Sequence, residues 1–237
     1  MTKNRKKKPR SGKFIVLEGL DGAGTTTQSN LLQQYFEAQK WPVITTSEPT
    51  QGPMGVILRL LLSKRLTFGS STKKIPQKEY LSNSAIALLF AADRLDHLQD
   101  VILPKLNDGV IVICDRYYFS NYAYQMNAER SNFEWLQTIN DQCIVPDLTI
   151  FLNTSLSVCA KRRNSNRWYQ DLYEKTEILE RVAQNYEYVF DSLKEKCRIE
   201  IIDGTPSEKV VFNEILTAIH NNFPEMFPGD LPLFPLQ

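Results

Sequence analysis

The feature that most constrains this chain is a glycine-rich stretch near its start, from residue 19 to residue 27. It follows the apolar run Phe14–Leu17 and precedes an amphipathic segment that begins near Gln28. This is the strand, glycine turn and helix order of a phosphate-binding loop, in which backbone N–H groups and a helix start face the anion. The residues predicted to hold a polyphosphate are Gly19, Leu20, Asp21, Gly22, Ala23, Gly24, Thr25, Thr26 and Thr27.

One residue in this loop departs from the usual pattern. Position 25 is threonine, where such loops carry the lysine that reaches the outer phosphates. The glycine spacing alone also fits an ordinary strand-to-helix turn, so the rest of the chain has to decide between the two interpretations.

Length and composition favour one α/β domain. A chain of 237 residues with 42% hydrophobic residues can bury a full core, although two small domains also fit this length. A formal net charge of +1 argues against a general nucleic-acid-binding protein. No apolar run reaches the roughly 18 residues of a membrane span, and no signal peptide is recognisable, so we expect a cytoplasmic protein.

The cysteines show neither the paired spacing of a zinc site nor a disulfide framework. We expect four reduced, buried thiols in strand or helix interiors, which fits the cytoplasm. They are Cys114, Cys143, Cys159 and Cys197.

The two ends differ from the middle of the chain. Residues 1–13 are rich in lysine and arginine, and we expect a disordered tail. Contact with nucleic acid or an acidic surface is the alternative, but no aromatic residue stands between the charges to stack on bases. Residues 224–237 are proline-rich and are predicted to form an extended tail.

Between the tails, short apolar runs alternate with helical periodicity, which predicts a doubly wound α/β fold. Runs that are apolar throughout suit a parallel sheet that is covered on both faces. The predicted strands are Phe14–Leu17, Val43–Thr46, Val110–Cys114, Leu148–Leu152 and Ile199–Ile202. A long helix is predicted from about residue 77 to residue 106, with an apolar stripe of Leu81, Ala85, Leu88, Leu89, Ala92 and Leu95.

In this fold, ligands bind at the carboxyl ends of the strands. Charged residues follow three of the predicted strands, at Glu18, Glu48 and the pair Asp115-Arg116. An aspartate in the place of Asp115 typically holds magnesium, together with a loop hydroxyl such as that of Thr26. The alternative is that Asp115 and Arg116 pair with each other or cap a helix.

Several stretches in fixed order resemble the thymidylate kinase family, over residues 14–223. They are Phe14-Ile15-Val16-Leu17-Glu18-Gly19-Leu20-Asp21-Gly22-Ala23-Gly24, Glu48-Pro49, Leu89-Phe90-Ala91-Ala92-Asp93-Arg94, Asp115-Arg116-Tyr117, Ser120-Asn121-Tyr122-Ala123-Tyr124-Gln125 and Pro146-Asp147-Leu148. The resemblance implies a single kinase domain with a five-stranded parallel sheet, in which the glycine loop binds ATP.

The resemblance also implies an acceptor site for dTMP. Phe90 looks like the residue that stacks on thymine, although periodicity alone would place it in the core, and Arg94 like the arginine that contacts the base edge. Arg116 would grip the dTMP phosphate, and Asp21 would contact the sugar or the metal. Tyr124 would crowd the 2′ position. The residues expected at this site are Glu48, Phe90, Arg94, Asp115, Arg116, Asn121, Tyr124 and Gln125.

The basic segment at about residues 161–175 resembles the lid of the family. An arginine from the lid would neutralise the charge of the transferred phosphoryl group, and Arg163 and Arg167 are the candidates. The alternative is that these cations only stabilise a helix end. The residues predicted to act in catalysis are therefore Asp21, Arg116, Arg163 and Arg167. Ser47 is a second departure, because many bacterial relatives have arginine there.

We therefore expect a magnesium-dependent enzyme that transfers the γ-phosphoryl group of ATP directly to dTMP. Only two histidines, His97 and His220, are present, and they suggest neither a Ser-His-Asp triad nor a metal cluster. The family implies a homodimer, with no membrane and no specific nucleic acid as partner. Two alternatives remain, which are a kinase for another deoxynucleotide or a nucleoside, and a nucleotide-binding module without catalysis.

Overall fold

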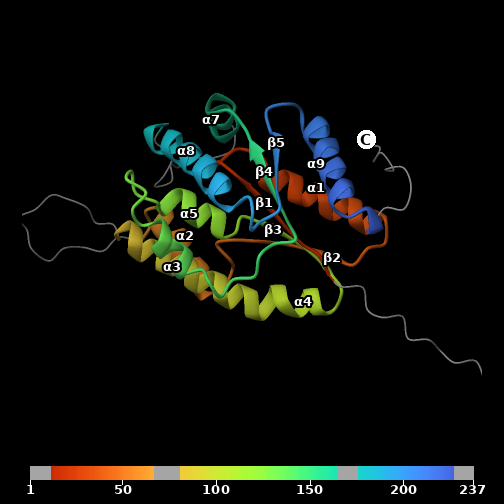
Figure 1. Ribbon diagram of the computed structural model, residues 1–237, viewed down its shortest axis with the longest axis horizontal. Helices are drawn as coiled ribbons and strands as arrows, with labels where there is room; N and C mark the ends of the chain where they lie inside the picture. Colours follow the sequence, from red (N-terminus) through yellow and green to blue (C-terminus); the bar gives the residue numbers. More distant parts are fainter. Residues whose placement is uncertain (1–11, 67–80, 165–175, 227–237) are drawn as a thin grey trace, which may run out of the picture.

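The computed structural model describes residues 12–66, 81–164 and 176–226, and its centre is a parallel sheet (Figure 1). The sheet has five strands in the order β2-β3-β1-β4-β5. The strands are β1 (Phe14–Gly19), β2 (Val43–Ser47), β3 (Ile111–Asp115), β4 (Leu148–Asn153) and β5 (Ile199–Asp203). The predicted fold class and all five predicted strands are confirmed, with shifts of one or two residues at their ends.

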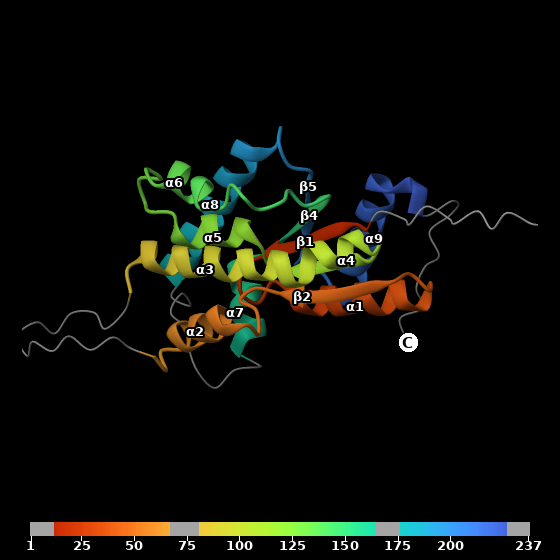
Figure 2. The ribbon, with the colours of Figure 1, turned by 90° about the horizontal axis from the view of Figure 1, so that it is seen from below.

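Helices cover both faces of the sheet. α1 (Thr25–Ala38) and α9 (Glu208–Asn222) lie side by side on one face, to the right of the strands in Figure 1. The other face carries α3 (Asn83–His97), α4 (Leu103–Asn107), α5 (Tyr118–Gln125) and α8 (Thr176–Leu193). The remaining α-helices of the described ranges are α2 (Pro53–Leu62), which packs on α3, α6 (Phe133–Thr138), which packs on α5, and α7 (Leu156–Asn164). In Figure 2, α2 and α7 lie in the lower part of the molecule, as α1 does.

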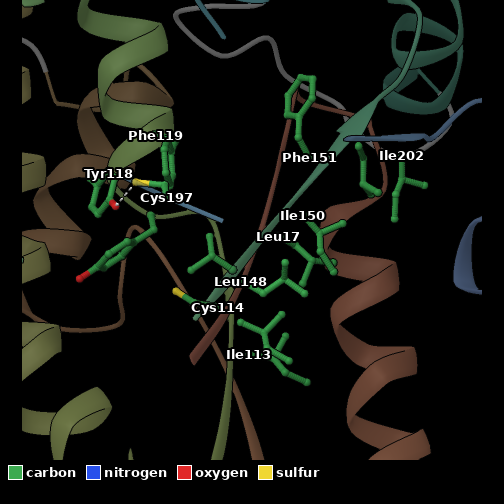
Figure 3. Close-up of a cluster of buried hydrophobic side chains, with 14 of the residues drawn as sticks. Leu17, Ile113, Cys114, Tyr118, Phe119, Leu148, Ile150, Phe151, Cys197 and Ile202 are labelled. Carbon is green, nitrogen blue, oxygen red and sulfur yellow. Dashed lines mark hydrogen bonds between the residues drawn. The ribbon is translucent and has the colours of Figure 1, made fainter. Parts of the chain in front are cut away.

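The central strands β1, β3 and β4 are buried on both faces, which is why most of their residues are apolar. Figure 3 shows Leu17, Ile113 and Ile150 in one cluster, and all three are completely buried. On the α8 side, the rings of Tyr186 and Phe190 each lie 4.8 Å from the ring of Phe151. This packing fixes the strand ends that carry the polar residues.

The predicted long helix is interrupted. α3 continues into a π-helical turn, Leu98–Ile102, and then into α4. Pro104 has no N–H to donate to the carbonyl of Asp100, and a wider turn before it accommodates this loss. Residues 81 and 82 are not helical, so within the described part the helix begins later than predicted.

The predicted apolar stripe of this helix does not face the core. Leu88 is 50% exposed and Ala92 is also exposed. The residues that α3 buries are instead Ile86, Ala87, Ala91, Asp93, Arg94 and His97. A cavity lies under α3, and the side chains that α3 turns towards the interior are therefore partly polar. The predicted apolar stripe lies on the outer side of the helix instead.

Other predictions need smaller corrections. All four cysteines are free, but Cys143 and Cys197 lie in loops and Cys143 is only half-buried. Pro224–Met226 form a turn of 3₁₀-helix where an extended chain was predicted. Residues 1–11, 165–175 and 227–237 lie outside the described ranges, and with them most of both predicted tails and most of the predicted lid. In the described ranges, no helix is both long and apolar enough to cross a membrane.

Candidate functional site

The glycine loop lies between β1 and α1 and has the conformation that a phosphate-binding loop requires. Gly22 and Gly24 have φ values of 90° and 104°, a region that side chains other than glycine rarely adopt. A Cβ atom at Gly22 would also lie 2.5 Å from the carbonyl oxygen of Cys159. Since α1 begins at Thr25, the unpaired N–H groups of its first turn adjoin the loop.

Two cavities adjoin at this end of the sheet. The first, which we call the loop cavity, has a volume of about 590 Å³ and is lined by the glycine loop, by Arg162 and Arg163 of α7, and by residues 204 and 206–208. The second, the helix cavity, has a volume of about 540 Å³ and is lined by residues of α2, α3 and α5 and by the ends of β2 and β3. Asp21 and Arg116 line both cavities. The molecule therefore has two neighbouring compartments that meet at one ion pair.

That ion pair is well defined. Arg116 Nη2 lies 2.7 Å from Asp21 Oδ1, and Arg116 Nη1 donates to Ser120 Oγ at 3.0 Å. Burial opposes the charge of Arg116, but the Tyr124 hydroxyl and the Asp21 carboxylate raise the pKa of its guanidinium well above the usual range. The arginine is therefore a permanent cation where the cavities meet. The alternative in which Asp115 pairs with Arg116 is not seen, since Arg116 pairs with Asp21.

Thr26 and Asp115 meet beside the loop, as the predicted metal ligands should. Thr26 Oγ1 donates to Asp115 Oδ2 at 2.5 Å. Asp115 Oδ1 is buried and has no hydrogen-bond partner among the described residues. A buried carboxylate oxygen without a partner next to a hydroxyl fits a hard cation such as Mg²⁺, which prefers oxygen ligands.

Arg94 forms the floor of the helix cavity and is 1% exposed. Its Nε and Nη2 both lie 2.8 Å from Glu48 Oε2, and its Nη1 donates to Asn140 Oδ1 at 2.5 Å. Glu48 also accepts from His97. Glu48 therefore lies at the predicted site but holds Arg94 in place. Sequence reasoning missed Asn140, because it stands in a turn after α6 with no motif around it.

The other residues predicted for the acceptor site come together in the same cavity. Phe90 is half-buried and lines the helix cavity with Asn121, Tyr124 and Gln125. Asn121 Nδ2 donates to Gln125 Oε1 at 3.0 Å, and the guanidinium of Arg116 lies 5.6 Å from the centre of the Tyr124 ring. Phe90 thus faces a cavity, which the helical periodicity alone did not predict.

Two arginines of α7 reach the glycine loop. Arg163 Nη1 donates to the carbonyl oxygen of Asp21 at 2.5 Å. Arg162 Nη1 donates to the carbonyl oxygens of Ala23 and Gly204, and its Nη2 donates to those of Thr205 and Pro206. Arg162 thus joins the two walls of the loop cavity. Only its place in the run Lys161-Arg162-Arg163 signalled this role, and Arg167 lies outside the described residues.

The expectation that no histidine belongs to a cluster of metal-ligand types was wrong for His97. Ligand atoms of His97, Glu48 and Cys114 lie within 4.8 Å of one another. However, His97 already contacts Thr46 Oγ1 at 2.7 Å and Glu48 at 3.1 Å. Cys114 Sγ donates to the carbonyl oxygen of Arg116, and burial raises the pKa of this thiol well above its usual range. These groups satisfy one another, and we assign no metal to them.

The parallel sheet, the glycine loop at the end of β1 and the two adjoining cavities define a phosphate-loop protein of the nucleotide kinase type. Residues 17–215 match the sequence model of thymidylate kinase. The chain belongs to the thymidylate kinase family, whose members are nucleoside monophosphate kinases.

Similar proteins cover nearly the same length. The chain is 37% identical to a probable thymidylate kinase of Pyrococcus abyssi over 208 residues, which are 88% of this chain and 96% of that one. It is 38% identical to a probable thymidylate kinase of Staphylothermus marinus over 205 residues, 86% of this chain and 93% of that one. It is 35% identical to a putative thymidylate kinase of Treponema pallidum over 212 residues, 86% of this chain and 92% of that one.

Proposed function

We propose that this protein transfers the γ-phosphoryl group of ATP to dTMP, giving dTDP and ADP, by direct in-line transfer. The observation that carries the proposal is the lining of both cavities by Asp21 and Arg116. Direct transfer needs two substrates whose reacting atoms meet at one point that is rich in positive charge. Membership of the thymidylate kinase family supports dTMP as the acceptor.

ATP would occupy the loop cavity, with its phosphates on the amides of residues 22–27. In place of the missing lysine, Arg163 brings a cation to the loop, where its guanidinium contacts Asp21. When ATP binds, the Arg163 guanidinium can exchange its hydrogen bond to the neutral Asp21 carbonyl for one to a phosphate. A hydrogen bond between two charged groups is stronger than one to a neutral carbonyl. Arg167 remains a proposed second cation of the lid.

The acceptor dTMP would occupy the helix cavity. Phe90 would stack on the base, Arg94 would reach the base edge from the cavity floor, and Arg116 would hold the phosphate. Glu48 and Asn140 keep Arg94 charged and oriented. Tyr124 lies against Arg116, where a sugar joined to that phosphate would pass.

Thr26 and Asp115 would hold Mg²⁺, which when bound neutralises part of the phosphate charge and orients the outer phosphates. The partnerless Asp115 Oδ1 supports this assignment. The residues of the chain supply the rest, since the loop amides, Arg163 and Arg116 would bind the charged groups.

A coupled assay of ADP release tests the proposal, with dTMP, dUMP, dCMP and thymidine as acceptors. We expect ADP release to require magnesium and to be fastest with dTMP. Faster turnover of thymidine or of another deoxynucleotide would reject dTMP as the acceptor. Binding of ATP and dTMP without ADP release would instead identify a nucleotide-binding module that lost catalysis with the lysine at position 25.

The domain organisation, assembly and location are part of the same proposal. We propose one kinase domain over residues 14–223, with a lid at about residues 161–175. A basic tail precedes this domain, and a proline-rich tail follows it. The apolar face of α3, with Leu88 and Ala92 exposed and Leu95 half-buried, suits pairing of two copies. The free thiols of all four cysteines support a cytoplasmic location.

A further inference from the structure

Glu18, the residue before Gly19 on β1, is completely buried next to the two cavities. Its carboxylate accepts four hydrogen bonds. Oε1 accepts from the backbone N–H groups of Tyr117 and Ser120 at 2.9 and 3.2 Å. Oε2 accepts from Ser120 Oγ and from the Tyr186 hydroxyl at 2.5 and 2.9 Å. Every partner except Tyr186 lies within four residues of Arg116.

The two backbone contacts make Glu18 a cap for α5. Tyr117 precedes the first residue of this helix, and its own side chain makes no capping hydrogen bond. The carboxylate of Glu18, from a different element, takes over the N–H groups that a capping side chain would normally satisfy. A negative charge at this end is also favoured by the helix dipole.

The contact with the Ser120 hydroxyl links Glu18 to Arg116. A hydroxyl has one proton to donate and two lone pairs. Because the Ser120 proton goes to Glu18 Oε2, a lone pair remains to accept from Arg116 Nη1 at 3.0 Å. Arg116 also has a φ value of 72°, a strained conformation that its surroundings must hold. The fixed turn after it, which Glu18 ties down through Tyr117 and Ser120, provides that support.

Keeping a carboxylate in this place is costly. Burial raises the pKa of Glu18, and Arg116 together with the hydrogen bonds of Ser120, Tyr117 and Tyr186 only partly offsets it. An uncharged acceptor would cap α5 at a lower desolvation cost. The charge therefore has a use beyond packing, and the group it acts on is Arg116.

We propose that Glu18 is a positioning residue, which through Ser120 sets the direction in which Arg116 presents its guanidinium to the acceptor phosphate. This inference rests on the proposed function, since it assigns Arg116 to the phosphate of dTMP. It concerns the helix cavity and predicts no change in the loop cavity.

The substitution Glu18→Gln tests the proposal with little change in shape. The glutamine oxygen can still cap α5, but its NH₂ group faces the two hydroxyls and cannot accept the Ser120 proton. The Ser120 hydroxyl must then rotate, which redirects the lone pair that accepts from Arg116. We expect the KM for dTMP to rise about tenfold, the equivalent of a hydrogen bond of ~1.4 kcal/mol to a charged group. The KM for ATP should stay within about twofold of the wild-type value. An unchanged KM for dTMP, or an equal rise for both substrates, overturns the proposal.

Two further variants separate positioning from general damage to the fold. Ile102→Ala removes a completely buried side chain from the π-helical turn, far from the loop in sequence, and serves as the destabilised control with both KM values kept. Ser120→Ala and the double variant Glu18→Gln/Ser120→Ala complete a cycle. If Glu18 acts through Ser120, the double variant should raise the KM for dTMP little more than either single variant. If the double variant instead raises the KM for dTMP by the product of the two single effects, Glu18 and Ser120 act independently, and the proposed action of Glu18 through Ser120 is rejected. Failure of the proposed function is distinguishable, because the wild type itself would then not phosphorylate dTMP.

Discussion

Thr26 and Asp115 are 89 positions apart in the chain, yet the Thr26 hydroxyl donates to the Asp115 carboxylate at 2.5 Å. The contact exists because β1 and β3 are neighbours, with Leu17 in register with Asp115. The first turn of α1 therefore starts beside the end of β3. A hydroxyl and a carboxylate from two different elements meet where the phosphates of a nucleotide would lie.

If these two residues hold magnesium, Thr26→Val should weaken its binding while the volume of the side chain is kept. We expect the magnesium concentration for half-maximal activity to rise about 10- to 100-fold, the range seen when a metal site loses a supporting group. Thr26→Ser keeps the hydroxyl and is the matched control. A magnesium titration of the rate at saturating ATP and dTMP measures the effect, and equal titration curves for all three proteins would exclude Thr26 as a ligand.

Replacement of Arg116 should act on the acceptor. Arg116→Ala removes a charge-assisted contact of roughly 1.5–3 kcal/mol, so kcat/KM for dTMP should fall about 10- to 100-fold. Arg116→Lys should recover little of this loss, because an ammonium group cannot bind a phosphate in the two-pronged way of a guanidinium. Arg198→Ala is the control, since Arg198 is exposed at the start of β5, at the other end of the strands. An unchanged rate with Arg116→Ala would show that another group holds the phosphate.

The role of Arg163 as a substitute for the missing loop lysine can be tested by placing lysine at position 25. Arg163→Ala should lower kcat by about one to two powers of ten, the value of one charge-assisted hydrogen bond to the transferred group. Thr25→Lys should restore much of that rate in the Arg163→Ala background and add little to the wild type. Steady-state kinetics of the four proteins decide. A large gain from Thr25→Lys in the wild type would mean that no residue of α7 replaces the lysine.

The exposed face of α3 gives a prediction about assembly. Leu88→Glu puts a charge on a side chain that is 50% exposed in the single chain. If two copies pair through this face, the charge would be buried without a partner, and dimers should dissociate. Lys194→Glu, an exposed change in the turn after α8, is the control. Sedimentation over a range of protein concentrations measures the mass, and dimers of the Leu88→Glu variant would exclude this interface.

The buried carboxylate of Glu18 should make folding stability depend on pH. Burial raises its pKa above the ordinary value of 4.5, so above this pH the folded protein keeps a proton that the unfolded chain has lost. The stability of the wild type should therefore fall, relative to Glu18→Gln, as the pH rises from 4.5 through the raised pKa. Urea unfolding of both proteins across this range measures the difference. A constant difference would mean that the pKa of Glu18 is the same in both states.

Much of this protein could be predicted from local sequence. The apolar runs identified all five strands. The signal was strongest for β1, β3 and β4, because a central strand that is covered on both faces is apolar at most positions. The glycines at 22 and 24 identified the loop, because only glycine adopts its φ values without strain. The charged residues at the strand ends identified the edge of the sheet that carries the site.

Other features depended on which parts of the chain meet in space. The sequence placed Phe90 and Leu88 on apolar positions of one helix, but only the packing of α3 on α2 and α5 shows that Phe90 faces a cavity and Leu88 faces solvent. Asn140 belongs to no motif, and Arg162 is one of several cations in the predicted lid segment. Their particular roles follow from partners 46 and 139 positions away.

The sequence by itself determined the fold class, the phosphate-binding loop and the family, because each of these depends on residue types at fixed local spacing. The tertiary structure alone decided that Glu18 caps α5 and orients Ser120, and that Asp21 and Arg116 form an ion pair between two cavities. The physical reason is that a buried polar group must find a partner, and which partner it finds depends on the order of the strands and the packing of the helices.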